Sequence, residues 1–462
     1  MPWAVLLLLI AIAPPALAEL PRPITADGAA FVHLQPFDQG AARLDFEIAS
    51  LAALSADGAA IPIHVSLHLV EGSRMDRQRR LGYGPLPPGR YTGLTISLRA
   101  GRLRGEEGAA DLAAPEGPVE IPVPFQVDKG RARLLLLTLD SGRAVGEGFQ
   151  LVPAFEARLA VPPPVGRLGL ASTPGAASIG VFDRYSAEMV GYVLTLREPS
   201  GMARDFREDR VYAALAGDDR VVVIGLRNQE VLEALRLQGG DRPVELALTP
   251  DGATLLAVNE GSRTLSFIDP RSMVETGRIS VGNGPHSVLV DPRGERAWVF
   301  NTESASLSVV DLARRVVITA VATDSEPFRG QFTRRGDALY VIHRRSPYLT
   351  VVDPESFSVR DRVLLGAPGT ALRVDTRTGL VYVAPRGAGQ IDVYDPISFL
   401  PVDSLPVTGE VSFLTIDGEQ NRLFAGLADG PDLLAYPLAG KKIATRIDLG
   451  APSYWISLVG ER

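Results

Sequence analysis

Short apolar runs recur at a fixed spacing through residues 167–462. Each run is typical of a β-strand, and five of them end in aspartate, often followed by proline, at positions 181–183, 267–270, 309–311, 351–354 and 393–396. The aspartates from Asp269 to Asp395 lie 42 residues apart, and the same spacing identifies two degenerate units at 223–225 and 435–437. A repeat of roughly 40–45 residues built from short β-type runs is the signature of a β-propeller blade. The seven units therefore predict a seven-bladed β-propeller.

The strands within a unit can be assigned from its best preserved copy. Residues 254–258, 265–268 and 274–281 are predicted strands, and a Gly-Asn-Gly-Pro turn at 282–285 leads into 286–290, the innermost strand of the next blade. The recurring aspartates are predicted to form turns, because an Asp side chain can bond the backbone two residues ahead. The alternative is a ring of metal-binding carboxylates. It is disfavoured because one aspartate per blade, near the outer half of the sheet, spreads these groups around the disc.

The two ends of the repeat region complement each other. The region opens with what matches the second strand of a blade, at 168–171, and it ends with 454–459, which matches the innermost strands of other blades. We therefore predict that the two ends pair in one sheet. Such pairing leaves no free strand edge, and free edges promote aggregation.

Residues 19–160 show alternating β patterns without the blade spacing. Apolar and polar positions alternate along 61–69, 91–98 and 119–127, and a further strand is predicted over 132–139. This is the pattern of half-buried strands in an antiparallel sheet. We predict an all-β protein with a small antiparallel β-sandwich at 19–160, a proline-rich linker at 161–166 and the propeller at 167–462.

The first eighteen residues resemble a secretory signal peptide. An apolar run at 3–13 is followed by Pro14-Pro15 and by Ala16-Leu17-Ala18, the small-x-small pattern of a cleavage site. We expect cleavage after residue 18 and export to the periplasm, the exterior or the cell surface, with an uncleaved anchor as the alternative. No later segment approaches eighteen consecutive apolar residues, so we expect no membrane span after cleavage.

Composition narrows the chemistry further. The chain has no cysteine, which excludes disulfides, covalent haem attachment and thiolate metal sites. Its 47 Lys and Arg are outnumbered by 54 Asp and Glu, and no predicted element concentrates basic residues, so nucleic acid is not an expected partner. Linear motifs for a nucleophile elbow, a phosphate loop or a zinc site are missing. We therefore expect no cofactor and no metal, although a catalytic group assembled across blades would be invisible to linear motifs.

Three spellings within the repeats carry a family resemblance. They are Leu-Leu-Ala-Val-Asn at 255–259, Leu-Tyr-Val-Ile-His at 339–343 and Leu-Val-Tyr-Val-Ala at 380–384. With the turn Gly-Asn-Gly-Pro-His at 282–286, they resemble the bacterial surface-layer repeats named for Tyr-Val-Thr-Asn. The resemblance implies a propeller fold. It leaves the function open, because related propellers include binding scaffolds, lactonases and non-haem subunits of periplasmic oxidoreductases.

The first domain carries a second resemblance. Its stretch Leu-Pro-Pro-Gly-Arg-Tyr-Thr at 86–92, together with Phe-Gln-Val at 125–127, resembles small sandwiches of the transthyretin or carbohydrate-binding type. The resemblance implies an architectural turn rather than a ligand site. Carbohydrate binding by this domain is one of the functions left open.

Candidate site residues are sought where turns gather on one rim of the propeller. The turns into the innermost strands and the turns after the second strands contribute Arg242, Glu245, His286, Glu326, Arg329, His343, Glu410 and Tyr454, with Arg344, Glu260 and Trp455 beside them. His286 is the strongest single candidate, although a histidine there can also serve turn packing. His343 lies 42 residues after Asn301 and is predicted to replace a turn asparagine.

These observations favour a binding function over catalysis. A complete scaffold without reactive clusters suggests an exported, non-catalytic protein that uses this rim to bind a protein or a cell-envelope polymer. The alternatives are a lactonase-like hydrolase and an accessory propeller subunit of a periplasmic oxidoreductase. The oligomeric state does not follow from the sequence.

Overall fold

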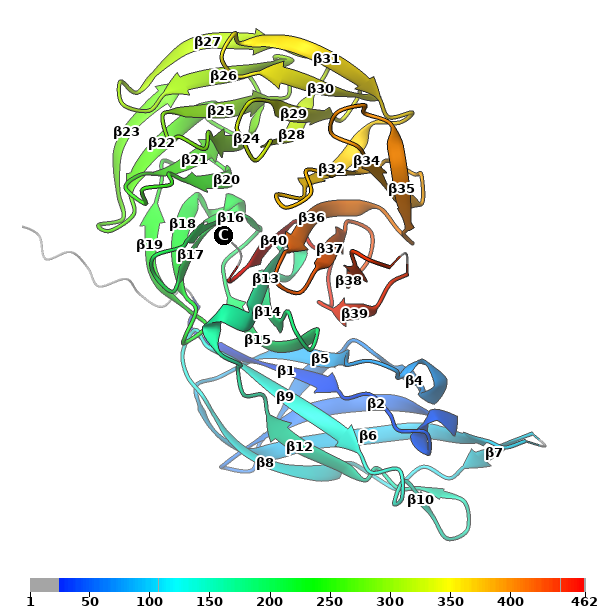
Figure 1. Cartoon of the computed structure of the whole chain (residues 1–462). Coiled ribbons are helices and arrows are strands. Elements are labelled where there is room, and N and C mark those ends of the chain that lie inside the picture. The colour runs from blue at the N-terminus through cyan, green and yellow to red at the C-terminus, as the bar shows by residue number, and fades with distance from the viewer. Residues whose placement is uncertain (1–24, 107, 441, 461–462) are drawn as a thin grey trace, which may run out of the picture.

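A computed structural model describes residues 25–106, 108–440 and 442–460, and the predicted signal peptide lies outside this part of the chain. Two all-β units are visible in Figure 1: a curled sheet, coloured blue to cyan, and a ring of sheets, coloured green to red. Helix is confined to five single turns, η1 Ala41–Arg43, η2 Gly72–Arg74, η3 Val165–Arg167, η4 Pro174–Ala176 and η5 Ala216–Asp218. The described residues contain no helix with the length and hydrophobicity needed to cross a membrane.

The first unit is a strongly curled sheet that encloses its own core. Its strands run in the order β12-β9-β1-β5-β3-β2-β6-β7, with β4 also on β2 and β8 also on β6. The predicted strands at 119–127 and 132–139 are confirmed as β8 and β9. The bounds are β1 Gly28–Leu34, β2 Leu44–Ser55, β3 Ala60–Val65, β4 Leu69–Glu71, β5 Arg79–Leu86, β6 Gly89–Arg104, β7 Ala109–Leu112, β8 Val119–Val127, β9 Ala132–Leu139 and β12 Phe155–Leu159, with the two-residue strands β10 Val145–Gly146 and β11 Gln150–Leu151 forming a separate pair.

One predicted strand of this unit was only partly right. The alternation over 61–69 predicted one strand, but the structure has two, β3 and β4, separated by a bend at 66–68. Both strands pair with β2, whose register shifts between Ile48 and Ser50. The shift interrupts the ladder at this point, so the chain leaves β2 and rejoins it further along.

The second unit is the predicted seven-bladed propeller. It contains seven four-stranded antiparallel sheets, and Figure 1 shows the innermost strands β16, β20, β24, β28, β32, β36 and β40 around a common axis. We number the blades by chain order, so that blade 1 is β13 to β15 with β40, blade 2 is β16 to β19 and blade 7 is β36 to β39. The bounds are β13 Leu168–Thr173, β14 Ser178–Asp183, β15 Glu188–Leu194, β16 Pro199–Asp205, β17 Arg210–Leu215, β18 Arg220–Gly225, β19 Glu230–Arg236, β20 Pro243–Leu248, β21 Leu255–Asn259, β22 Thr264–Asp269, β23 Val274–Ser280, β24 Pro285–Val290, β25 Arg296–Asn301, β26 Ser306–Asp311, β27 Val316–Ala322, β28 Pro327–Phe332, β29 Leu339–His343, β30 Tyr348–Asp353, β31 Ser358–Leu364, β32 Gly369–Val374, β33 Val381–Pro385, β34 Gln390–Tyr394, β35 Pro401–Pro406, β36 Val411–Asp417, β37 Arg422–Leu427, β38 Asp432–Pro437, β39 Thr445–Asp448 and β40 Trp455–Leu458.

The ring closes as the sequence predicted. β40 pairs antiparallel with β13, so the last strand of the chain completes the first sheet. Backbone bonds extend the pairing at both ends, from Tyr454 N to Ser172 O at 2.9 Å and from Val459 N to Leu168 O at 2.8 Å. The turn role of the aspartates is also confirmed. The Asp269 carboxylate accepts the backbone N–H of Arg271 at 2.8 Å, and the other aspartates of this column accept comparable bonds.

The two units share a packed interface. Phe31 of β1 stacks on Tyr192 of β15, with 3.7 Å between ring centroids, and the Tyr192 hydroxyl lies 2.8 Å from His33 Nε2. Arg77 donates two bonds to the Asp432 carboxylate, at 2.9 and 3.1 Å. These contacts reach outer strand β15 and outer hairpin β38–β39, so the first unit rests on the circumference of the ring rather than on an end of its channel (Figure 1).

An ion pair buried between blades 1 and 7 makes a sharp stability prediction. Arg184, which follows β14, bonds the Asp417 carboxylate at the end of β36 at 2.5 Å, and both side chains are almost fully buried. Arg184→Met leaves Asp417 charged and unpaired, so we expect a loss of about 3–5 kcal/mol in the free energy of unfolding. Urea unfolding measures the loss. The exposed pair of Arg314 with Asp311 supplies the control, since Arg314→Met should cost about 1 kcal/mol or less. Equal losses in the two variants would contradict the prediction.

Candidate functional site

The blade spacing places a ring of side chains around the channel axis. The ring consists of the third residue of each innermost strand from β16 to β36 and the first residue of β40. Each strand from β16 to β36 shifts register against its neighbour near this position, as at a β-bulge. The members of this axial ring are Gly201, Glu245, Ser287, Arg329, Ala371, Phe413 and Trp455, and the last six are spaced by 42 residues.

Arg329 of β28 reaches across the axis. Its Nη1 donates to Ser412 O of blade 7 at 2.8 Å, and its Nη2 lies 3.3 Å from Tyr454 O of blade 1. The guanidinium carbon lies 4.8 to 5.4 Å from the ring centroids of four aromatic residues, Phe328, Phe413, Tyr454 and Trp455. The side chain is therefore held by carbonyl oxygens and aromatic faces, both of which stabilise a guanidinium without neutralising it.

Glu245 of β20 lies in the same ring and is 1% exposed. Its Oε1 accepts a bond from Ser287 Oγ at 2.6 Å and one from Val288 N at 3.2 Å, while its Oε2 has no hydrogen-bond partner. Burial raises the pKa of Glu245 to about 7, although the charge of Arg329 opposes the rise. At neutral pH this carboxyl therefore carries only part of a negative charge.

His286 of β24 lies one residue outside this ring and is neutral. Its Nε2 is 3.3 Å from Arg344 Nη2 and 3.2 Å from the Tyr454 hydroxyl, and its ring stacks on Phe328. Because a guanidinium can only donate, Nε2 must accept, which places the ring proton on Nδ1 facing Glu260 Oε1 at 3.8 Å. Burial lowers the pKa of His286 to about 4, in agreement with a neutral acceptor.

Arg344 stands at the entrance to this cluster. It follows β29, and its guanidinium carbon lies 4.3 Å from the ring centroid of Phe328. Burial lowers the pKa of Arg344. Among the described residues, no carboxylate oxygen comes within 4.0 Å of a guanidinium nitrogen of either Arg344 or Arg329. The site therefore holds two arginines that lack an anionic partner.

A hollow of about 190 Å³ opens beside these two arginines, between blades 5, 6 and 7. We call it the channel mouth. Its wall includes the hydroxyl-bearing Thr370, Ser412 and Tyr454 as well as Arg386, which pairs with Glu410 at 3.5 Å. The remaining lining residues are Phe328, Arg329, Arg344, Gly369, Val411 and Ala428. The mouth therefore combines net positive charge with hydroxyl groups and one aromatic wall.

The structure separates the sequence-predicted site residues into three groups. Glu245, His286, Arg329 and Tyr454 come together at the axis, with Glu410 at the lip of the mouth. Arg242 and Glu326 lie outside this cluster, and His343 is buried at the end of β29.

The three residues outside the cluster have local roles. Arg242 lies 3.4 Å from Glu198, Glu326 pairs with Arg345 at 2.9 Å, and both hold the positive φ that Gly284 adopts in blade 4. His343 Nδ1 bonds Tyr348 O at 3.2 Å, as Asn259 and Asn301 bond the hydroxyls that follow their strands, so its predicted asparagine-like turn role is confirmed.

Sequence reasoning missed the aromatic residues that enclose Arg329. Phe328 and Phe413 stand in the same 42-residue columns as His286 and Glu245, so the spacing could have found them. They were passed over because an apolar residue in a strand is ordinarily core.

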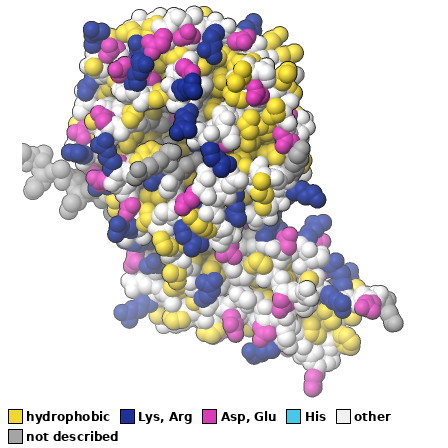
Figure 2. Space-filling view, viewed as in Figure 1, with side chains coloured by type: hydrophobic (Ala, Val, Ile, Leu, Met, Phe, Trp, Pro, Cys, Tyr) yellow, Lys and Arg dark blue, Asp and Glu magenta, His cyan; other side chains and the backbone are white. Residues whose placement is uncertain are grey.

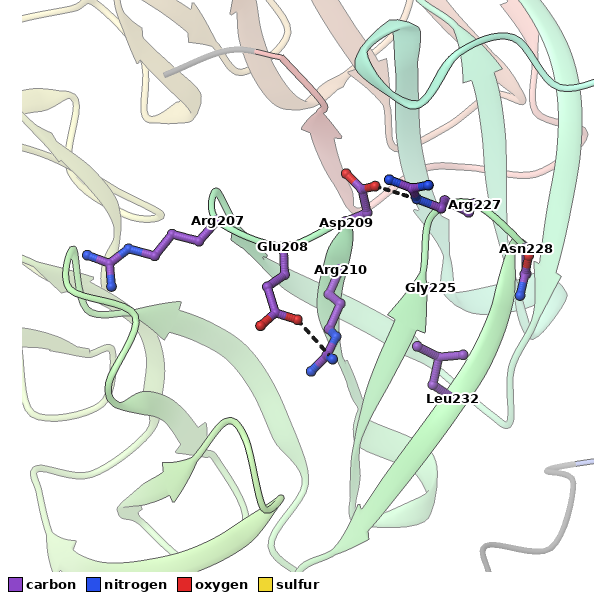
Figure 3. Close-up of a pocket in the computed structure, with 8 residues that line it drawn as sticks. All are labelled: Arg207, Glu208, Asp209, Arg210, Gly225, Arg227, Asn228 and Leu232. Atoms are coloured by element: carbon purple, nitrogen blue, oxygen red, sulfur yellow. Dashed lines mark hydrogen bonds and ion pairs between the residues drawn. The ribbon is translucent and has the colours of Figure 1, made fainter.

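A second hollow, on blade 2, is larger but electrically balanced. It is a surface groove of about 550 Å³, shown in Figure 3. Its charged side chains pair within the groove, Arg210 with Glu208 at 2.8 Å and Arg227 with Asp209 at 2.7 Å. It therefore offers no uncompensated charge to a ligand, in contrast to the channel mouth.

Comparisons with known proteins support the fold alone. No protein-family model and no curated protein matches the sequence. Similar solved structures include hydrazine synthase of Kuenenia stuttgartiensis, with TM-score 0.54, 17% identity, and 59% of this chain and 93% of that chain covered. Another is the dihydro-heme d1 dehydrogenase NirN in complex with DHE, with TM-score 0.52, 12% identity, and 65% and 77% covered. A third is a functionally unknown protein of Desulfotomaculum acetoxidans, with TM-score 0.57, 13% identity, and 64% and 100% covered. The similarity to surface-layer repeats stays a prediction.

Proposed function

We propose that this chain is an exported, non-catalytic binding protein, and that its channel mouth receives an anionic group presented by a protein or cell-envelope polymer. The observation that carries the proposal is the pair Arg329 and Arg344, which lie beside one hollow without a carboxylate partner. A buried charge is expensive unless it is paired. An oxyanion in the mouth would supply the missing partner.

The surroundings of the two arginines favour a carboxylate-sized group. The planar guanidinium fork matches a carboxylate with two parallel bonds. The hydroxyls of Thr370, Ser412 and Tyr454 line the same hollow. Glu245 is a weak internal competitor, because its pKa of about 7 leaves it partly neutral. A bound anion would therefore meet two cations and one incomplete negative charge.

The size of the mouth bears on the kind of partner. Its volume of about 190 Å³ lies below the roughly 300–1,000 Å³ typical of pockets that enclose a drug-sized ligand. The mouth is suited to the tip of a larger molecule, such as an Asp or Glu side chain on a protruding loop. Most of the binding surface would then come from the surrounding rim, where Arg242, Glu326 and Glu410 lie.

Substitution of Arg344 tests the proposal directly. Arg344→Gln removes a charge-assisted bond worth about 1.5–3 kcal/mol, so we expect a glutamate-rich peptide to bind roughly 10- to 100-fold more weakly. Isothermal titration calorimetry gives the affinity, and the fluorescence of Trp455, which contacts Arg329, reports on the site. The neighbouring Arg345→Gln is the matched control, since Arg345 is 77% exposed and already paired with Glu326. Equal affinities for wild type and Arg344→Gln would contradict the proposal.

A hydrolase of the lactonase type is the second candidate. It is favoured by the Glu245 carboxyl, whose pKa of about 7 is the value expected of a general base that works at neutral pH. Its burial at 1% exposure argues against direct contact with a substrate. Turnover of lactones that is abolished by Glu245→Gln and retained by Arg344→Gln would favour this candidate over binding.

A further inference from the structure

A second groove lies at the end of the propeller opposite the channel mouth. It is bordered by the β28–β29 hairpin, by strand β31, by the β32–β33 hairpin and by the turn between β34 and β35, and its volume is about 460 Å³. The mouth lies at the start of β28, whereas this groove lies at its end. The two hollows therefore open on opposite faces of the disc.

Four arginines line this groove, which we call the arginine groove. They are Arg334, Arg335, Arg360 and Arg377, and Asp337 is the one carboxylate in the lining. Among the residues that the structure describes, no carboxylate oxygen lies within 4.0 Å of a guanidinium nitrogen of these four. Formal charge in the groove is therefore strongly positive, although the chain as a whole carries −7.

The nearby acidic side chains are committed to local structure. Asp337 accepts a bond from Thr333 Oγ1, and Asp375 accepts bonds from Arg377 N at 2.9 Å and Thr378 Oγ1 at 2.6 Å, as in an Asx turn. Arg334 reaches a neutral acceptor, with its Nη1 3.4 Å from Thr376 O. These groups stabilise the hairpins without cancelling the positive charge.

Apolar side chains form the other wall of the groove. Tyr340, Val374, Pro396 and Ile397 line it, and Ile397 is 90% exposed. Leu400, 64% exposed, continues the apolar surface along the same turn. Figure 2 shows hydrophobic side chains gathered over the sheet of β32 to β35, with Lys and Arg side chains scattered around them. The groove thus offers cationic and apolar surface side by side.

We propose that the arginine groove binds an acidic segment of a protein partner, in which Asp or Glu residues alternate with apolar ones. Guanidinium forks pair with carboxylates, and the exposed Ile397 and Pro396 provide a surface for the apolar residues. The volume of about 460 Å³ falls within the range of enclosed ligands and is large for a single oxyanion. This site uses no residue of the channel mouth. With both sites occupied, the propeller would hold two acidic partners on opposite faces.

Fluorescence anisotropy with a defined peptide tests this proposal. The probe is a fluorescein-labelled peptide of repeated Asp-Glu-Leu, titrated with the full chain at low salt. Arg335 and Arg360 have no partner in the described structure and are exposed, so Arg335→Glu with Arg360→Glu should fold normally. We expect the double variant to raise Kd more than tenfold. Arg271→Glu with Arg314→Glu, two exposed arginines on turns of other blades, is the matched control and should leave Kd within twofold.

Several outcomes would overturn the proposal. Unchanged affinity in the Arg335/Arg360 double variant, with an unaltered melting temperature, places the peptide elsewhere. Loss of binding in Arg344→Gln instead assigns the peptide to the channel mouth and separates this proposal from the proposed function. Equal binding of a peptide with Ser in place of Asp and Glu removes the charge argument. Displacement of the peptide by inorganic polyphosphate at lower concentration than by unlabelled peptide identifies a phosphate-bearing ligand in its place.

Discussion

Deletion of residues 452–462 is expected to destabilise the propeller by roughly 5–9 kcal/mol and to cause aggregation. The deletion removes Ile456, Leu458 and Val459, which are buried, and each buried aliphatic side chain contributes about 1.5–3 kcal/mol. It also exposes β13 as an unpaired strand edge, and such edges recruit other chains. Thermal unfolding and size-exclusion chromatography with light scattering measure the two effects.

The controls for this deletion follow from the position of β40. Deletion of residues 461–462 alone leaves the whole of β40 in place and should leave the melting temperature unchanged. A synthetic peptide of residues 452–460 added in excess should restore part of the lost stability, because it can re-pair with β13. If the truncated protein melts at the wild-type temperature, the ring is closed by interactions other than the terminal strand pair.

Acidification from pH 7.5 to pH 4.5 is expected to destabilise the folded protein by several kcal/mol. Burial lowers the pKa of His33, His286 and His343 to about 4, against 6.5 for an ordinary histidine. Between these values the unfolded chain binds protons that the folded chain refuses, so stability falls as pH falls from about 6.5 to about 4. Each histidine accounts for about 3 kcal/mol over the full interval. Urea unfolding at a series of pH values measures the slope.

Glu245 works in the opposite direction and can be separated by mutation. Its pKa is raised to about 7 from the usual 4.5, so the folded chain binds the extra proton and this group favours folding as pH falls through 7 towards 4.5. We expect Glu245→Gln to remove that contribution and to steepen the loss of stability below pH 7. His33→Gln should make the pH profile shallower, whereas replacement of the exposed His64 and His68 should leave it unchanged. A profile that does not respond to His33→Gln would contradict the assignment.

The axial cluster explains why this protein carries ionisable groups where a propeller of ordinary packing has none. Innermost strands converge on the axis, so their side chains meet across blades that are distant in sequence. Arg329 joins blade 5 to blades 7 and 1 through two carbonyl oxygens. Its charge, the partly neutral Glu245 and the neutral His286 together leave net positive potential at the mouth, which suits an anionic partner and favours its approach.

Blade number, strand order and closure of the ring were predictable from local pattern. Hydrophobic spacing reports which positions of a strand are buried, and the 42-residue period repeats that report blade after blade. The turn role of Asp269 and its counterparts was predictable for the same reason, since it depends on atoms two residues away. The strand at 61–69 was only partly right because its break follows from a bulge in its partner β2, to which the sequence of 61–69 does not respond.

The candidate site could be predicted only as a set of columns. The columns contained Glu245, His286, Arg329 and Tyr454, but they also contained Arg242, Glu326 and His343, and the spacing treats all of them alike. Burial separates these residues, and burial depends on how far each side chain reaches across the axis. The same holds for the arginine groove, whose four arginines come from three separate segments of the chain and look unremarkable along it.

Local pattern decides the secondary structure and its order here because the hydrophobic period acts over a few residues. The sites depend on distances between blades, and those distances exist only once the ring has closed. Pairing of β40 with β13 brings Tyr454 and Trp455 against Arg329, 125 residues away in the chain for Tyr454. The charge balance of the mouth and of the arginine groove is therefore a property of the closed ring, set by which side chains it brings within reach of one another and which it leaves without a partner.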